Sequence, residues 1–215
     1  MINLPKYYWA CLIALFLSNP VLAATPVGQI LFSKGQLHVI HQGQTQTATR
    51  GSKIWLGDTL ITGNNSRALL RFADGTRTTL GDNTEYQIQT FSLDQTGQSR
   101  AVYKLVKGVF KTVTGAIASN DKSHQVETAL GTIGIRGTTF WGGYLVADKL
   151  DVLLIDGEHA VVVSNALGSQ ELNRSGEGTT LSSQQPPGPV KNWPQAKVDR
   201  AYATVAWPEL PEFSE

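Results

Sequence analysis

Cysteine is almost absent from this chain of 215 residues. Its one cysteine, Cys11, lies inside the first apolar run, so the chain beyond that run can form neither a disulfide nor a cysteine-ligated metal site. Stability must therefore come from a packed hydrophobic core, and the chain is long enough to bury one.

An excess of positive charge is missing too. The chain carries 18 lysines and arginines against 17 aspartates and glutamates, and loss of an N-terminal leader containing Lys6 would make the two signs equal. Nucleic-acid-binding proteins are usually strongly basic, so this balance argues against nucleic acid as a partner. After residue 23 no run approaches the ~18 apolar residues of a membrane-spanning helix, so we expect no membrane insertion of the mature chain.

The first 23 residues have the pattern of a secretory signal peptide. Lys6 gives a basic start, an apolar run follows at residues 10–17, and small residues come next. This run is shorter than the ~20 residues that span a bilayer. We therefore expect cleavage between Ala23 and Ala24 and a periplasmic or secreted protein, with an uncleaved N-terminal anchor as the alternative.

Between residues 30 and 181, short apolar runs alternate with turn residues. The runs are rich in Val, Ile, Thr, Tyr and Phe, which is typical of β-strands, and no window shows the 3.6-residue period of a helix. The sequence therefore predicts an all-β domain, as a sandwich, roll or solenoid. The predicted strands are residues 37–40, 67–72, 84–88, 102–106, 109–113, 152–155 and 160–163.

Residues 67–72 show the pattern of a half-buried strand. Ala68, Leu70 and Phe72 fall on one face, with the arginines on the other. The following Asp74-Gly75 is a hairpin signal. A two-residue turn would place Leu80 away from Leu70, and a bulged three-residue turn would place it on the same face, so the register stays open.

The composition changes after the predicted β domain, which we place at residues 24–183. A proline-rich linker at 184–189 opens a C-terminal tail, residues 184–215, in which 194–205 can form a short helix. Trp193, Trp207 and Phe213 give this tail bulky apolar groups. Either the tail folds back and closes one end of the β domain, or it docks on a partner.

A glycine- and threonine-rich run, residues 126–141, predicts a β-strand that bends or lets another backbone approach. Its glycines at 131, 134 and 137 fit neither nucleotide-binding fingerprint, and no helix follows them. Arg136 is the charged residue among them. We expect it in a buried or half-buried ion pair, with solvent exposure and a ligand or partner contact as alternatives.

Four segments of the chain together resemble a known family. They read GSKIWLGDTLITGNNSRALLRFADGTRTTL (51–80), LVKGVFK (105–111), VETALGTIGIRGTTFW (126–141) and VLLIDGEHAVVV (152–163). In this order, over residues 28–181, they are similar to the FecR domain family of the bacterial envelope. Where that family commonly has Thr-Pro, this chain has Thr128-Ala129, which makes the local turn less rigid. The matching positions, mainly structural, are Gly57, Asp58, Gly63, Asp74, Gly75, Gly131, Gly134, Arg136, Gly137, Thr138, Phe140 and Gly157.

The resemblance implies a two-layer β-roll or solenoid-like domain, used for signal reception and protein contact. In transmembrane members a cytoplasmic segment controls a sigma factor, and the β domain receives a signal from an outer-membrane transporter. We expect neither that segment nor a transmembrane helix here, so sigma-factor control is not carried over. The implied partner is an envelope or membrane sensor or transporter protein.

No metal, cofactor or catalytic site is predicted. His38 and His41 are three apart in a predicted strand and so face opposite ways, while His124 and His159 stand alone. The Gly57-Asp58 pair reads as a turn in which the carboxylate accepts backbone N–H groups. The other acids that could form a glycosidase pair, Asp148 with Asp151 or Asp156 with Glu158, read as turn or surface residues.

The sequence therefore predicts a non-catalytic envelope protein that binds a protein partner in signal reception or regulation. A structural or carbohydrate-binding role, with cell-wall glycan as ligand, is the alternative. Exposed rows of aromatic rings would favour it, and the candidates are Trp55, Trp141, Tyr103 and Tyr144. A hydrolase would need a polar cleft with two acids at glycosidase separation.

Overall fold

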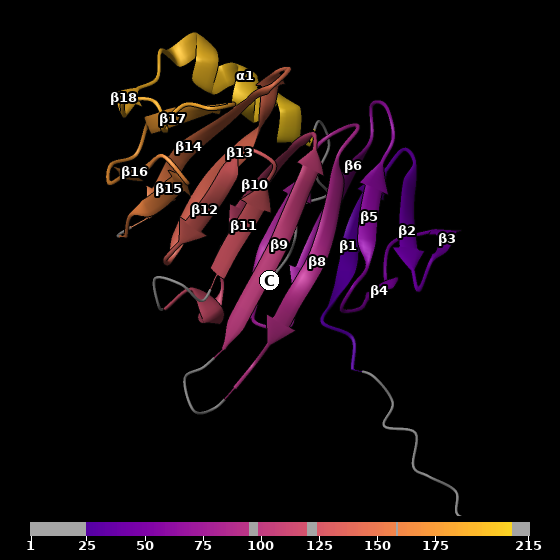
Figure 1. Ribbon diagram of the computed structural model, residues 1–215. Helices are drawn as coiled ribbons and strands as arrows, with labels where there is room; N and C mark the ends of the chain where they lie inside the picture. The colour runs from indigo at the N-terminus through magenta and orange to yellow at the C-terminus, as the bar shows by residue number, and fades with distance from the viewer. Residues whose placement is uncertain (1–24, 95–98, 120–123, 158, 208–215) are drawn as a thin grey trace, which may run out of the picture.

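The computed structural model describes residues 25–94, 99–119, 124–157 and 159–207 (Figure 1). The predicted signal peptide and its Ala23/Ala24 cleavage site lie outside these residues, as do Glu158 and Phe213.

Two nine-stranded sheets face each other across the core. Sheet A contains, in spatial order, β18 (Lys191–Asn192), β17 (Glu177–Ser182), β14 (Lys149–Gly157), β13 (Thr138–Val146), β10 (Val109–Val113), β7 (Arg77–Leu80), β6 (Arg67–Phe72), β1 (Gly28–Lys34) and β4 (Lys53–Ile54). Sheet B contains β16 (Gly168–Leu172), β15 (Val161–Asn165), β12 (Gly131–Ile135), β11 (His124–Thr128), β9 (Arg100–Lys107), β8 (Glu85–Ser92), β5 (Thr59–Thr62), β2 (Leu37–His41) and β3 (Gln44–Thr47). A 3₁₀ turn, η1 (Ala116–Ser119), and one helix, α1 (Gln195–Val205), complete the described elements.

Successive strand pairs alternate between the two sheets along the chain. The hairpin β6–β7 lies in sheet A, β8–β9 in sheet B, β13–β14 in sheet A and β15–β16 in sheet B. Among the described strand pairs, β9 with β11 is parallel and the others are antiparallel. This winding confirms the predicted all-β, two-layer roll or solenoid-like domain.

The main core lies between the sheets and consists of the inward residues of alternating strands. Leu70, Phe72 and Ala68 are buried while Arg71 is exposed, as the period-two pattern predicts. Aromatic rings stack through the centre, with Tyr86 and Tyr103 centroids 5.4 Å apart. Further fully buried members are Ile30, Leu37, Ile54, Leu60, Leu80, Phe110 and Phe140.

The hairpin after β6 uses the bulged three-residue turn. The Phe72 N–H donates to the Thr76 carbonyl at 2.9 Å, and the Gly75 N–H donates to the Phe72 carbonyl at 3.0 Å. Gly75 has φ +88°, a conformation in which a side chain would be strained. Leu80 therefore pairs with Ala68 and joins the buried face.

The prediction that residues 126–141 form one bent strand is wrong. This run forms the end of β11, a turn, β12, and the start of β13, and it crosses from sheet B to sheet A at Arg136-Gly137. Gly137 has φ +59° at this crossing, which favours glycine over residues with a side chain. The glycines therefore serve a reversal and a crossing between sheets.

The tail does not close an end of the β domain. After β18, α1 crosses the outer face of sheet A and forms a second apolar cluster with it (Figure 1). In that cluster Ala201 and Val205 of α1 pack with Val109, Trp141 and Leu153. The indole N–H of Trp141 also donates to the Thr204 hydroxyl at 3.0 Å.

Two further contacts hold the start of α1. Lys197 Nζ lies 2.6 Å from the Asp151 carboxylate and 3.9 Å from the centroid of the Trp193 ring. With 11 residues, α1 is too short to cross a bilayer, and no other helix among the described residues is long and apolar enough.

The four edges of the sheets differ. Sheet A ends in β4 and β18, which have two residues each and carry one lysine each. In sheet B, the edge strand β16 carries Glu171, whereas β3 has four exposed, uncharged residues, Gln44–Thr47. Short or charged edges resist pairing with other chains, so β3 is the least protected of the four.

Candidate functional site

Turns from both sheets meet at one end of the sandwich and form a groove. Two adjoining hollows, of about 540 and 610 Å³, share Ala129, Leu130 and Ser183. We call this continuous surface the turn-end groove. Its other walls are the turns after β9, β13 and β15 and the end of β17, which include Lys107, Gly108, Ala147, Asp148, Ala166, Leu167, Ser182 and Gln184.

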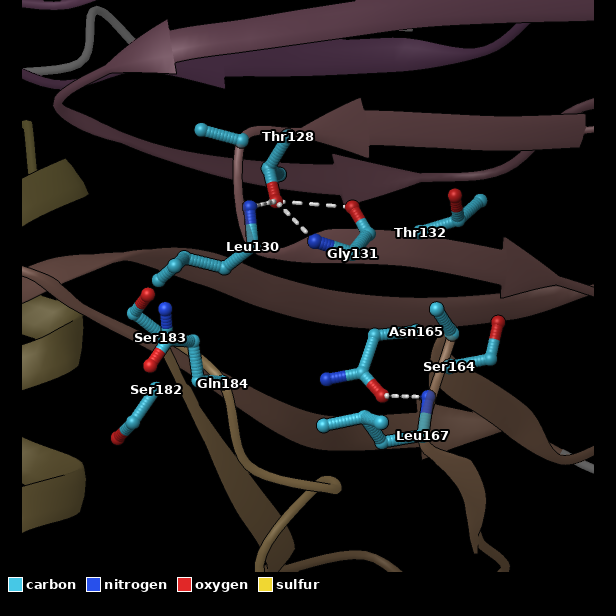
Figure 2. Close-up of a pocket in the computed structure, with 12 residues that line it drawn as sticks. Thr128, Leu130, Gly131, Thr132, Ser164, Asn165, Leu167, Ser182, Ser183 and Gln184 are labelled. Carbon is cyan, nitrogen blue, oxygen red and sulfur yellow. Dashed lines mark hydrogen bonds between the residues drawn. The ribbon is translucent and has the colours of Figure 1, made fainter.

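Thr128 builds the turn at the centre of the groove (Figure 2). Its hydroxyl accepts the N–H groups of Leu130 and Gly131, each at 3.1 Å, and donates to the Gly131 carbonyl at 2.8 Å. This turn has Ala129-Leu130 at its tip, residues with no turn preference of their own. The threonine side chain thus supplies the hydrogen bonds that reverse the chain.

Gly131 lets β12 and the β15 end approach closely beneath the groove. A Cβ atom at Gly131 would lie 2.3 Å from the Ser164 carbonyl oxygen and 2.6 Å from Leu181 Cδ2. The opposite wall is fixed by Asn165, whose side-chain oxygen accepts the Leu167 N–H at 2.9 Å (Figure 2). The Asn165 amide also donates to the Gln185 carbonyl at 2.7 Å, which ties the proline-rich segment to this end.

The groove is neutral, polar inside and apolar at its rim. Hydroxyl and amide side chains dominate the first hollow, and Tyr144 lines the second, where burial raises the pKa of its hydroxyl and Thr128 partly offsets that rise. Exposed apolar side chains line or adjoin the groove: Val106 (43% exposed) and Leu167 (58%) belong to its lining, and Val146 (53%) is next to the lining residue Ala147. Such a surface can hydrogen-bond a polypeptide backbone and cover apolar side chains.

The charged groups in the lining are Lys107 and Asp148. Lys107 lies 4.0 Å from Glu85, and Asp148 sits in the β13–β14 turn with φ +61°. The described lining therefore offers one carboxylate and one ammonium, and no second carboxylate for the acid–base pair of a glycosidase.

The family-motif residues lie outside the groove, except Gly131. Gly57 and Asp58 form the turn before β5, where the buried Asp58 carboxylate accepts the Trp55 N–H at 2.8 Å and contacts His41 Nδ1 at 2.6 Å. Asp74 caps its own turn by accepting the Thr76 N–H at 3.0 Å and the Thr76 hydroxyl at 2.7 Å. The remaining positions lie in strands or turns: Gly63 before β6, Gly134 in β12, Thr138 and Phe140 in β13, and Gly157 at the end of β14.

Arg136 is exposed, so its expected burial is wrong. It follows β12 at the crossing between the sheets, where the chain runs over the surface. Together with His159 and Glu171 it lines a hollow of about 290 Å³, away from the turn-end groove.

His124 belongs to a buried polar cluster within the core. Its ring centroid lies 5.3 Å from that of Tyr103, and both ring nitrogens lack a hydrogen-bond partner among the described residues. Burial lowers the pKa of His124 to about 4, and Asp74 partly offsets this effect. Burial also raises the pKa of the Tyr86 and Tyr103 hydroxyls well above 10. No group of three metal-ligating side chains occurs in the part of the chain that the structure describes.

The aromatic candidates for a glycan surface do not form an exposed row. Tyr103 and Trp141 are buried in the two apolar clusters, and Tyr144 is half-buried in the groove. Trp55 packs against His41, with ring centroids 6.1 Å apart. Of the carboxylates considered as a glycosidase pair, Asp151 contacts Lys197 and Thr180.

Sequence reasoning missed the turn-end groove because its walls come from turns far apart along the chain. The available signals were apolar residues inside or beside turns, such as Val146 and Leu167. Such residues are unusual where turn positions are normally polar.

Comparison with known protein families shows that residues 58–158 match the FecR family, whose description is FecR protein. Two crystal structures of a proposed anti-sigma factor from Parabacteroides distasonis are similar in fold, with TM-scores of 0.53 and 0.51 and 16% sequence identity. Each alignment covers 66% of this chain and 62% of theirs, so the chain spans less than two thirds of their length. Comparison with curated proteins gave no match.

Proposed function

We propose that this chain, which carries a FecR domain over residues 58–158, is a non-catalytic binding protein of the bacterial envelope that receives a partner protein in signalling or regulation. The FecR match supports a regulatory role, and the sequence of the first 23 residues supports export. The partner we infer is an envelope or membrane sensor or transporter.

The observation that carries this proposal is the turn-end groove. A neutral hydrogen-bonding floor beside exposed Val106, Val146 and Leu167 suits an extended segment of a partner protein, because the backbone can bond to the floor while apolar side chains cover the rim. A neutral glycan is less favoured, because the described groove presents one half-buried ring, Tyr144, and no exposed aromatic platform.

Site-specific crosslinking tests the proposal. A photoreactive amino acid at Leu167 should give a covalent protein adduct in cells that express the chain, whereas the same group at Gln89, exposed on β8, should not. Ala129→Trp, which fills the place where the two hollows meet, should abolish the Leu167 adduct, and Gln89→Trp should leave it unchanged. Equal adducts at both positions, or an adduct that survives Ala129→Trp, would contradict binding in the groove.

A further inference from the structure

A row of positive charge crosses the outer face of sheet A, away from the turn-end groove. In the strand register, Lys53 of β4 pairs with Gln29 of β1, Gln29 with Arg71 of β6, and Arg71 with Arg77 of β7. The three cations are exposed. We call Lys53, Arg71 and Arg77 the basic row.

Arg71 and Arg77 are directly opposite each other on neighbouring strands. Like charges in such cross-strand pairs destabilise a sheet. Ion pairs are seen among the described residues for His41, Arg67, Lys107 and Lys197, none of which belongs to the basic row. Asp74 lies in the turn that joins the two strands, but its carboxylate is engaged by Thr76.

The next acid along the same row is distant. Beyond Arg77 the row continues through Val113 and Thr139 to Asp156 of β14, three strands away. At about 4.8 Å per strand this is roughly 14 Å, more than the Debye length at physiological salt. The arginine pair is therefore not neutralised by its own sheet.

A hollow of about 240 Å³ lies at the Lys53 end of the row, lined by Lys53, Arg71 and Gln29 with Pro26 and Phe72. Gly28, which also lines it, lets β1 lie close to β6 there, since a Cβ atom at this position would lie 2.7 Å from the Arg71 carbonyl oxygen. The row thus combines exposed cations with a recess large enough for a side chain.

We propose that the basic row binds an extended acidic segment of a partner protein. Lys53 and Arg77 are three strand spacings apart, about 14 Å, and carboxylates at positions i, i+2 and i+4 of an extended chain span about 13 Å. Guanidinium groups bind carboxylates through paired hydrogen bonds, and Val113 beside Arg77 offers an apolar contact. The linear spacing favours a polypeptide over an anionic lipid surface.

Peptide binding at low salt tests this proposal independently of the groove. The probe is a seven-residue peptide with glutamate at positions 2, 4 and 6, and its glutamine counterpart is the control. The glutamate peptide should bind the full chain, and R71Q/R77Q should weaken that binding at least about tenfold. The matched variant R100Q/K149Q, which removes two exposed cations elsewhere, should change it by less than about twofold.

Folding of the variants is checked by thermal unfolding. Because R77E replaces a repulsive pair with an attractive one, it should raise the unfolding midpoint while it abolishes peptide binding.

Equal losses of peptide affinity in R71Q/R77Q and R100Q/K149Q would overturn the proposal, as would equal binding of the two peptides. Row-dependent binding to phosphatidylglycerol vesicles without peptide binding would assign the row to a lipid surface instead. A variant with Glu209, Glu212 and Glu215 replaced by glutamine tests whether acids of this chain itself occupy the basic row and compete with the peptide. A tenfold gain in peptide affinity in this variant would overturn the assignment of the row to a partner.

Discussion

His124 is a buried ionisable residue that makes the stability of the fold depend on pH. Its ring lies against Tyr103, near Asp74, and burial lowers its pKa from 6.5 to about 4. The unfolded state therefore binds a proton that the folded state excludes between these two pH values. The His124 contribution to stability is fully present above pH 6.5, falls as the pH drops towards 4, and changes no further below that.

Substitution of His124 tests this linkage. The lowered pKa corresponds to on the order of 3 kcal/mol of folding free energy at neutral pH. His124→Leu should therefore flatten the dependence of the unfolding free energy on pH between 6.5 and 4, measured by urea titration at several pH values. Because aspartates and glutamates titrate in the same range, the slope of the unfolding free energy against pH in His124→Leu is compared with the slope in the unsubstituted protein. Parallel curves would contradict the prediction.

Gly131 carries a second residue-scale prediction. Gly131→Ala should reduce the free energy of unfolding by about 1–3 kcal/mol, because the new methyl group meets the Ser164 carbonyl and the backbone has φ +156°. Gly168→Ala is the matched control, since its nearest neighbour would be Pro186 Cβ at an ordinary 3.5 Å. Both are measured by chemical denaturation, and equal losses would contradict the steric explanation.

At the scale of elements, α1 is held by its contacts with sheet A. It lacks a side-chain N-cap, has no acid in its first turn and no base in its last turn. An isolated helix of this length is marginal in water, so docking against Trp141 and Leu153 stabilises it.

A pair of aspartate substitutions tests this dependence. Ala201→Asp places a charge against Trp141 and should undock α1, at a cost on the order of 3 kcal/mol. Ala203→Asp puts the same charge at an exposed position two residues on and should have little effect. Tryptophan emission and hydrogen exchange in residues 195–205 are the measurements. Retained protection in Ala201→Asp would contradict a docked helix.

Some strands could be predicted from the sequence, whereas one register and one turn could not. Residues 67–72 and 109–113 are strands with the predicted bounds, because alternation there is regular. The β6–β7 register could not be chosen, since Asp74-Gly75 is compatible with both a two-residue and a three-residue turn. The sequence of residues 126–141 predicts one strand because Ala129-Leu130 carries no turn signal, whereas the reversal depends on the Thr128 side chain.

At the scale of the whole molecule, the class of fold could be predicted from composition and from the alternation of apolar and polar residues. The functional surfaces could not be predicted in this way. The turn-end groove joins residues from positions 106 to 184, and the basic row places β4 and β1 beside the β6–β7 hairpin. Both depend on the order of strands within each sheet. That order is set by packing between sheets, which a single sequence does not reveal.

The edge strand β3 has a practical consequence for distance measurements. Its residues are exposed, and β3 and the groove lie in opposite halves of sheet B (Figure 1). The described residues contain no cysteine, so in a protein that starts at Ala24, Thr45→Cys would provide a single reactive thiol. A fluorophore attached there could report the arrival of a labelled partner by energy transfer without occupying the groove or the row.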